Sequence, residues 1–395
     1  MGSPKVQTHP GRAANALVHS AFILAGAATI ILGPVLPILI SRWSLTDEQA
    51  GLLFTFQFCG NLLGIAALGP LVSRHGYGRT FGIGFSLIAL GLAALNSGHE
   101  LISVTSTAVF GCGLGLVLPG ANLWVAEVAQ TRRASALSIL NFAWGIGAIT
   151  CPVLIMIAQR NNRLSILFFG IASVAALFAL GFMTIDIEPL SGFNPAVAPP
   201  RDVPPVKLRT AVTLACLFFL YCGTESAVGG WTAALAKRMG TSQGDFWALA
   251  PMCFWTGLLT GRALGPLVLP RVPERTVLNF GLILVCVCNG AILWVATLQG
   301  TAISLVAAGL GLACIYPLLV SSLVGFYGNR ASRTGSIIFA FAGLGSATIP
   351  SLVGFVSTRF GSLRVGLLVP LIACIVMLCF LNYLDKQKIP VPLET

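Results

Sequence analysis

The sequence predicts an all-α membrane protein of twelve transmembrane helices, arranged as two six-helix bundles. Of its 395 residues, 56% are hydrophobic and only 9% are charged, against roughly 25% charged residues in an average soluble domain. Apolar runs long enough to cross a bilayer recur along the whole chain. The two halves also repeat each other at a nearly constant offset. We therefore expect lipid to be the solvent for most of the surface.

Twelve apolar runs provide the predicted spans, each near or above the roughly 20 residues that a membrane helix needs. They cover residues 14–40, 50–72, 80–98, 101–129, 135–158, 164–185, 208–238, 246–269, 276–297, 300–326, 335–357 and 363–384. Residues 186–207 contain six prolines, which exclude a helix or a central strand. The predicted order is an N-terminal segment 1–13, a bundle 14–185, a linker 186–207, a bundle 208–384 and a tail 385–395.

The distribution of lysine and arginine predicts the orientation, because cytoplasmic loops carry the excess of these residues. With the N-terminus inside, fifteen of them fall on cytoplasmic segments and seven on outside segments. Both termini and the linker are then cytoplasmic. The first apolar run is long enough to span, so we expect no cleavable signal peptide. We expect the inner (plasma) membrane of a bacterium as the location.

Several other classes of protein fit the sequence poorly. The net charge of +11 is spread singly or in pairs between apolar runs, which argues against nucleic-acid binding. Most of the 11 cysteines lie in apolar segments without a CxxC pair or a histidine cluster, so they are interpreted as small buried residues. No HExxH, GxSxG or P-loop pattern is present. We expect no enzyme activity, no metal, no cofactor and a monomer in the lipid bilayer.

The internal repeat is visible in two separate helix pairs. The run Ala67-Leu-Gly-Pro-Leu-Val72 recurs as Ala263-Leu-Gly-Pro-Leu-Val268, at an offset of 196. Gly145, Gly147, Thr150 and Pro152 recur at an offset of 198, as Gly343, Gly345, Thr348 and Pro350. A repeat of six helices is even, so both copies cross the membrane in the same direction. Parallel repeats of this kind are related by an axis along the membrane normal.

Three motifs carry a resemblance to a known family. The stretch Gly69-Pro-Leu-Val-Ser-Arg74-His-Gly76-Tyr-Gly-Arg79 resembles the loop motif between helices two and three of the major facilitator superfamily, with Ser73 where an aspartate is usual. Glu127-Val-Ala-Gln-Thr-Arg-Arg133 is similar to the end of the fourth helix in sugar-porter-like members. Tyr221-Cys-Gly-Thr-Glu225, with the following Gly-Gly-Trp231, and Gly261-Arg262 resemble the fucose–proton symporter branch. The resemblance implies a secondary transporter.

Glu225 is the predicted centre of the site. Its helix places it near the bilayer midplane, where an acidic residue costs at least about 2.5–3.5 kcal/mol and should face a cavity or a partner. Tyr221, Thr224, Glu225 and Trp231 fall on one helical face. Aromatic rings beside a carboxyl suit a sugar-like ligand. The alternative is a structural carboxyl that is bonded to a neighbouring helix.

Arg262 is the basic residue that lies well inside a span. It could bind an anionic substrate, pair with Glu225, or extend to the cytoplasmic interface, and we favour a structural or gating role. In the amino half, Asn122, Asn141 and Trp144 are the candidate substrate contacts, although helix-to-helix hydrogen bonds would also explain the amides.

A second set of residues predicts a gate on the cytoplasmic side. Glu127 lies where its helix leaves the membrane and could pair with Arg79 or Arg133. Arg79 and its repeat counterpart Arg275 would stabilise the outward-facing state, together with the motif residue Arg74. His19 is a further titratable group, in a first helix that has no carboxylate.

The resulting prediction is a secondary active transporter, a proton-coupled symporter of a sugar or similar small polar solute. The solute would bind between the halves near the midplane and cross by alternating access. The first alternative is an exporter of drugs or metabolites that works by proton antiport, for which we would expect a more apolar cavity. The alternatives from another class of protein are a membrane-embedded enzyme and a sensor that uses the same fold but transports nothing.

Overall fold

The structure is a computed structural model that describes residues 12–97, 99–129, 133–184, 187, 208–240, 244–327 and 331–386. Within these ranges the regular secondary structure is entirely helical. The predicted linker 186–207 lies outside the described residues except for Ile187. The predicted all-α fold class is therefore confirmed.

The helices coincide with the predicted apolar runs. In the amino half they are α1 (Arg12–Ile30), α2 (Leu32–Trp43), α3 (Asp47–Leu95), α4 (Glu100–Val128), α5 (Arg133–Arg160) and α6 (Leu164–Thr184). In the carboxyl half they are α7 (Leu208–Arg238), the 3-10 helix η1 (Gly244–Leu249), α8 (Ala250–Val268), α9 (Glu274–Trp294), α10 (Leu298–Ala313), α11 (Ile315–Tyr327), α12 (Ala331–Phe360), α13 (Leu363–Gly366) and α14 (Leu368–Lys386). Ten helical segments in the described ranges are long and apolar enough to span a membrane.

Helix α3 contains two of the predicted spans. Its course is interrupted at Gly76, whose backbone has φ 75° and ψ 173°. Glycine adopts this conformation without the steric clash that a Cβ atom would cause. The interruption lies between the predicted runs 50–72 and 80–98, inside the loop motif that ends at Arg79.

Three predicted runs each consist of two α-helices, and a proline follows each break. A proline lacks the N–H that would bond to the carbonyl four residues earlier, and its ring crowds that carbonyl. Helix α1 ends at Ile30, four residues before Pro34, and α10 ends at Ala313, four residues before Pro317. The break between α13 and α14 stands in the same relation to Pro370. Other prolines lie inside unbroken helices, such as Pro119 of α4 and Pro152 of α5, so a proline favours a break but does not determine one.

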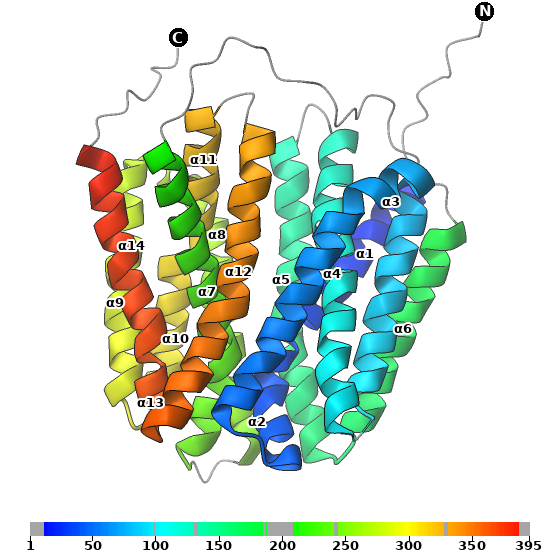
Figure 1. Ribbon diagram of the computed structural model, residues 1–395, viewed down its shortest axis with the longest axis horizontal. Coiled ribbons are helices and arrows are strands. Elements are labelled where there is room, and N and C mark those ends of the chain that lie inside the picture. The colour runs from blue at the N-terminus through cyan, green and yellow to red at the C-terminus, as the bar shows by residue number, and fades with distance from the viewer. Residues whose placement is uncertain are drawn as a thin grey trace, which may run out of the picture. The chain divides into compact units, whose positions relative to one another are not determined.

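By their packing, the described residues fall into two compact units. The first unit holds α1, α3 from Cys59 onward, α4, α6 and most of α5, and its core includes the stacked rings of Phe85 and Phe182 at 5.5 Å. The second unit holds Ile31–Phe58, the short stretch Ile155–Ile157 and all helices from α7 on. Within it α7 contacts α2, α8, α11, α12 and α14, and Figure 1 shows α7 beside α12 and α14.

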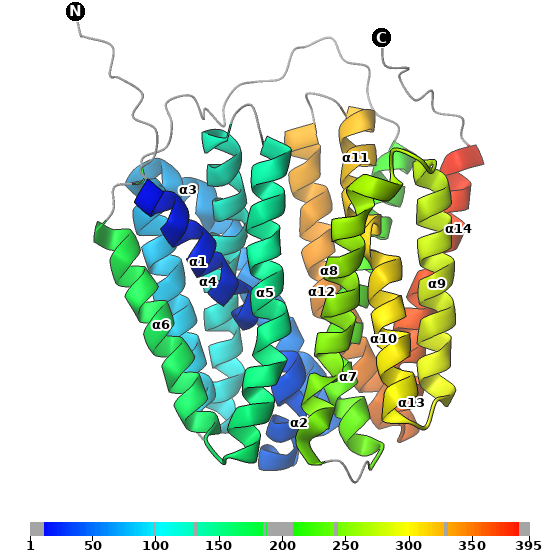
Figure 2. The ribbon, with the colours of Figure 1, turned by 180° about the vertical axis from the view of Figure 1, so that it is seen from behind.

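Inside the first unit, glycine allows α1 and α5 to approach closely (Figure 2). A Cβ atom on Gly26 would lie 2.0 Å from the carbonyl oxygen of Trp144, and one on Gly147 would lie 1.8 Å from that of Ile23. No larger residue fits either position without moving the backbone. Small residues serve this purpose in membrane helices, because lipid provides no hydrophobic force to press helices together.

The second unit repeats this contact between α7 and α12. A Cβ atom on Gly345 would lie 2.0 Å from the carbonyl oxygen of Phe219, and one on Gly223 would lie 2.8 Å from that of Gly345. Gly223 and Gly345 are 197 and 198 residues beyond Gly26 and Gly147. A second contact repeats in the same way, between α3 and α4 and between α9 and α10: Gly84 with Gly113, and Gly281 with Gly311. The sequence repeat is therefore also a repeat of packing.

We predict that Gly345→Ala lowers the free energy of unfolding by roughly 1–3 kcal/mol, the usual cost of overpacking. The thermal unfolding midpoint of the purified protein should fall accordingly. The matched control is Gly290→Ala in α9, because a Cβ atom there would meet nothing within 4 Å. The control should keep or raise the midpoint, since alanine favours helix over glycine by about 1 kcal/mol. Equal midpoints for the two variants would show that the close α7–α12 approach is not required.

Candidate functional site

An ion pair between two helices of the second unit forms the candidate site. Arg262 of α8 donates from Nη2 to Oε1 of Glu225 on α7 over 3.3 Å. The side chains are 27% and 17% exposed, so both charges are largely removed from solvent. Each charge offsets part of the desolvation cost of the other. Of the alternatives for Arg262, the structure shows the pairing with Glu225.

The position of the pair follows from the helices that carry it. Glu225 lies near the middle of the 31-residue α7. Glycines beside the pair let other helices approach: a Cβ atom on Gly223 would lie 2.3 Å from Ile349 of α12, and one on Gly261 would lie 2.4 Å from Ala313 at the end of α10. Close contacts of α7 with α12 and of α8 with α10 therefore lie next to the charges.

The broken helix α10–α11 brings an aromatic side chain to this region. Cys314, at the break, donates from Sγ to the carbonyl oxygen of Gly261 over 3.8 Å. Two residues on, the ring of Tyr316 lies 5.7 Å from that of Tyr221 and 5.6 Å from that of Phe218. Interrupted membrane helices often line binding sites, because irregular backbone is tolerated where it faces a cavity or other protein.

Some hydrogen-bonding capacity around the pair is not used. The hydroxyl of Tyr221 lies within electrostatic reach of both Glu225 and Arg262, yet within the described part of the chain it makes no hydrogen bond of ordinary geometry. The buried Nε of Arg262 also has no hydrogen-bond partner among these residues. Buried polar atoms are nearly always paired in folded proteins. Two such atoms beside one ion pair therefore suit a polar ligand.

Not all of the other residues predicted on α7 lie beside the Glu225–Arg262 ion pair. Thr224 is fully buried next to Glu225 in the sequence. Trp231 is also buried, but its indole Nε1 donates to the carbonyl oxygen of Pro350 over 2.9 Å and its ring lies 6.3 Å from that of Phe54. Its indole therefore anchors α7 to α12, six residues away from the ion pair along the helix.

In the first unit, the side-chain amides of the two predicted asparagines form a hydrogen bond with each other. Asn141 of α5 donates from Nδ2 to Oδ1 of Asn122 on α4 over 3.4 Å, and each amide also donates to a carbonyl of its own helix at 2.8 Å. Trp144 donates from Nε1 to Thr29 of α1 over 3.4 Å. Asn141 is exposed, whereas Asn122 and Trp144 are half-buried. These contacts link α5 to α4 and α1 and leave part of the Asn141 amide accessible.

Three of the predicted gating residues, Arg74, Arg79 and Glu127, lie around the interruption at Gly76. Glu127 accepts a hydrogen bond from the hydroxyl of the buried Tyr77 over 2.8 Å, while Arg74 and Arg79 are exposed. Arg275, in the first turn of α9, is exposed but has an interaction partner. The side chain of Arg133 lies outside the described residues. Sequence reasoning did not single out Tyr77, although it stands inside the loop motif between Gly76 and Gly78.

Comparisons with known proteins agree on one family. Residues 18–307 match the sequence profile of the Major Facilitator Superfamily. The glucose/mannose transporter of Bacillus subtilis strain 168 is 22% identical over 85% of this chain and 86% of its own length. A crystal structure of a bacterial homologue of the human lysosomal transporter Spinster superposes with a TM-score of 0.76, at 14% identity over 98% of both chains. The fucose:proton symporter of Escherichia coli superposes with a TM-score of 0.62, at 20% identity over 94% of this chain and 98% of that one.

We predict that Arg262→Gln and Glu225→Gln are each less stable than the parent by about 1–3 kcal/mol, because each leaves one charge without its partner. The double variant Glu225→Gln/Arg262→Gln should lose less than the sum, with a coupling energy of about 0.5–3 kcal/mol. Thermal unfolding of the purified variants measures this cycle. Arg209→Gln, which removes an exposed charge at the start of α7, is the control. Additive losses would contradict a functional ion pair.

Proposed function

Since the chain belongs to the Major Facilitator Superfamily, we propose that it is a proton-coupled symporter of a sugar or similar small polar solute, working by alternating access. Other members of this family are transporters, and the long apolar helices are those of an integral membrane protein. The observation that carries the proposal is the largely buried Glu225–Arg262 ion pair between α7 and α8, with unused hydrogen-bonding groups beside it.

The choice of a sugar-like solute rests on the chemistry of the pair and its surroundings. The charge of Arg262 is already balanced by Glu225, so little net charge remains to attract an anion. The half-buried ring of Tyr316 packs against the fully buried ring of Tyr221 and supplies an apolar face near the pair, and the hydroxyl of Tyr221 and Nε of Arg262 supply hydrogen-bonding groups. A sugar presents both apolar C–H faces and hydroxyl groups, which suits this combination. The similarity to a glucose/mannose transporter and to a fucose:proton symporter supports the same class.

The role of the proton follows from the same carboxyl. A carboxyl group in a poorly hydrated site favours the neutral form, and one in contact with water or a cation favours the charged form. Protonation of Glu225 would therefore weaken its bond to Arg262 and free the guanidinium to donate to the solute. Binding of the solute to Arg262 would in turn favour protonation of Glu225, since coupling between two ligands is reciprocal.

We further propose that Glu127 acts with Arg79 or Arg133 as a gate at the cytoplasmic end of the first repeat, that Arg74 of the loop motif supports it, and that Arg275 has the matching role in the second repeat, with both termini on the same side. The proposal rests on the lysine and arginine distribution and on the bond between Tyr77 and Glu127, which holds the loop motif at Gly76 against α4. The linker at 186–207 would then also be cytoplasmic, in the inner membrane of a bacterium.

A binding screen is the first test of the solute class. Purified protein is heated with sugars, amino acids, organic acids and apolar drugs in turn, and a bound compound raises the unfolding midpoint by mass action. We expect stabilisation by one or more neutral sugars. Stabilisation by drugs or organic acids alone would overturn the sugar proposal and favour an exporter or an anion carrier.

We predict that Glu225→Gln abolishes uptake driven by a pH gradient while preserving binding. The amide imitates the protonated carboxyl, so it can still accept a hydrogen bond but cannot release a proton. In proteoliposomes with the sugar from the screen, gradient-driven accumulation should fall by about tenfold or more, with affinity changed by less than about threefold. Exchange of internal for external sugar should persist.

The control for this experiment is Glu274→Gln, which neutralises an exposed carboxyl in the first turn of α9. It should accumulate sugar as the parent does. Concentrative uptake by Glu225→Gln at the parent level would show that the proton travels elsewhere, and His19 and Glu127 would be the next groups to test. Glu225→Ala should also weaken binding, because it removes a hydrogen-bonding group.

A further inference from the structure

A pocket of about 520 Å³ lies where α3 begins and α12 ends, and both of these segments belong to the second unit. Glu48 lines the pocket from α3, and Phe355, Thr358 and Arg359 line it from α12. The backbone N–H of Glu48 donates to Oγ1 of Thr358 over 2.9 Å. A hydrogen bond therefore joins the two helices that form the pocket.

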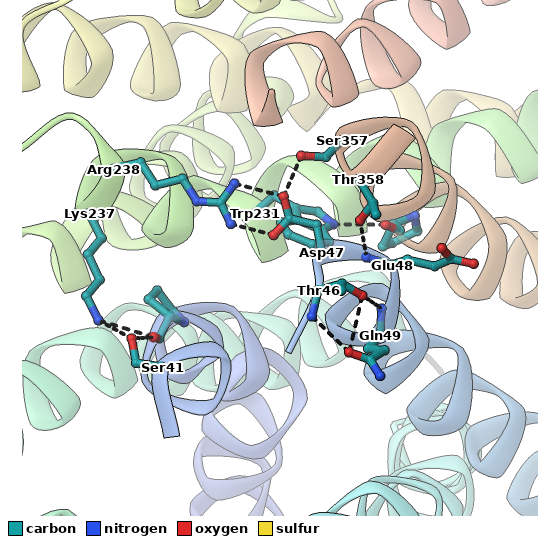
Figure 3. Close-up of polar contacts among 12 residues, drawn as sticks. Ser41, Thr46, Asp47, Glu48, Gln49, Trp231, Lys237, Arg238, Ser357 and Thr358 are labelled. Atoms are coloured by element: carbon teal, nitrogen blue, oxygen red, sulfur yellow. Dashed lines mark hydrogen bonds and ion pairs between the residues drawn. The ribbon is translucent and has the colours of Figure 1, made fainter. Parts of the chain in front are cut away.

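Neighbouring contacts hold both helices in place beside the pocket (Figure 3). The carboxylate of Asp47, the residue before Glu48, accepts hydrogen bonds from both terminal nitrogens of Arg238 at the end of α7, with Nη1 at 2.8 Å from Oδ2. Ser357, the residue before Thr358, donates to Oδ2 of the same carboxylate. Asp47 is thus engaged by two helices, whereas Figure 3 shows the side chain of Glu48 directed away from these contacts.

Two opposite charges line the pocket without pairing. Glu48 and Arg359 are both exposed. In the part of the chain that the structure describes, their charged groups form neither an ion pair with each other nor a hydrogen bond to another residue. A carboxylate only accepts hydrogen bonds and a guanidinium only donates them. The pocket therefore suits a ligand that carries a cation and an anion a short distance apart.

An apolar surface leads from the pocket along α12. Leu352, Phe355 and Arg359 are spaced by three and four residues, so they lie on one face of the helix. Leu352 and Phe355 are 40% and 49% exposed, and both lie within the apolar span Ile338–Phe360, which ends one residue beyond Arg359. An arginine at the end of a span lies at the level of the lipid headgroups. An amphiphile with its charged end in the pocket and its apolar part along α12 matches this surface.

We propose that the pocket binds the headgroup of phosphatidylethanolamine, with the lipid chains along Leu352 and Phe355. The primary ammonium of the lipid donates to the carboxylate of Glu48. The phosphate accepts from the guanidinium of Arg359, whose planar fork matches phosphate oxygens. The hydroxyl of Thr358 accepts the N–H of Glu48, so its own proton remains available for the phosphate.

Charge and hydrogen bonding select this headgroup over others in a bilayer. Phosphatidylcholine carries a trimethylammonium group, which has no N–H to donate to Glu48. Phosphatidylglycerol carries no cation, so its phosphate would meet the charge of Glu48 without compensation. Glycerophosphoethanolamine has the charges of the ethanolamine lipid but no chains to cover Leu352 and Phe355. The proposed ligand is therefore the lipid itself and not a soluble phosphodiester.

The lipid site is separate from the Glu225–Arg262 ion pair. Ile349 of α12 faces Gly223, two residues before Glu225. Arg359 lies ten residues farther along the same helix, a rise of about 15 Å. The lipid proposal goes beyond the proposed transport function and requires only that the protein lies in a phospholipid bilayer. Its test therefore measures binding and not transport.

Native mass spectrometry of the purified full-length protein tests the lipid preference. The delipidated protein in detergent is titrated with palmitoyl-oleoyl phosphatidylethanolamine, phosphatidylcholine or phosphatidylglycerol, and each adduct is identified by its mass. We expect the ethanolamine lipid to bind about tenfold more tightly than the other two, because it alone donates a charge-assisted hydrogen bond to Glu48. An equal concentration of glycerophosphoethanolamine should not displace it. Equal affinities for the three lipids, or displacement by the soluble headgroup, would overturn the proposal.

Two substitutions separate the roles of the charges. Glu48→Gln should reduce the preference for ethanolamine over choline to about twofold or less, because the ammonium loses its charged partner. Arg359→Gln should weaken both lipids by about tenfold and leave their ratio unchanged, since both carry the phosphate. The parent ratio in Glu48→Gln, or the parent affinity in Arg359→Gln, would contradict the assignment.

Glu100→Gln and Arg163→Gln are the matched controls, because they remove exposed charges at the start of α4 and just before α6, away from the pocket. Both should bind the lipids as the parent does. Substitution of exposed residues changes stability little, so all four variants should unfold at the parent midpoint without lipid. The same loss of binding in the controls would indicate general charge attraction and would overturn the site.

Photolabelling of the unaltered protein locates the lipid independently of any substitution. The protein is illuminated with a phosphatidylethanolamine that carries a diazirine in its acyl chain near the headgroup, and the labelled peptides are identified by mass spectrometry. We expect labelling of residues 352–360, and an excess of unlabelled ethanolamine lipid should suppress it. Labelling confined to other helices would overturn the proposal.

Discussion

The structure depends on the constraint that backbone polar groups inside a bilayer must be satisfied by the chain itself. Lipid offers no hydrogen bonds, so each crossing segment has to be helical for nearly its whole length. Interruptions are then tolerated only where other protein or a water-filled cavity surrounds them. Prolines 34, 317 and 370 each stand four residues after the end of a helix. One of these interruptions, between α10 and α11, brings Tyr316 beside Tyr221 near the ion pair.

The same solvent explains how the helices are held together. Apolar surface gains little by leaving lipid, so packing depends on close backbone contact. Gly26 with Gly147 in the first unit, and Gly223 with Gly345 in the second, provide that contact at equivalent positions. In the second unit this close approach of α7 and α12 lies two residues before Glu225. The packing that joins the helices and the placement of the charged group are thus parts of one arrangement.

Two ion pairs show how surroundings decide the role of a charge. Glu225 and Arg262 are 37 residues apart and lie within the spans, with unused donors nearby. Asp47 and Arg238 are 191 residues apart and lie at the end of the second unit, where every named contact joins one helix to another. The first arrangement suits the binding of a polar solute and a proton. The second suits a contact that holds helices in place.

Local properties of the sequence determined the spans and the duplication, and they made Glu225 the first candidate for the site. Hydropathy along the chain was enough to predict the helical runs, since the bilayer sets their length, and a carboxyl in a span is costly wherever its helix packs. Helical spacing placed Trp231 on the face of Glu225, but tertiary packing directs its indole to Pro350. Sequence spacing left three roles open for Arg262, and it did not point to Asp47 or Ser357. Only the tertiary structure decided these partners, because they lie on helices distant in sequence. Which helices meet depends on backbone contacts at residues such as Gly261 and Gly354, and hydropathy does not record those contacts.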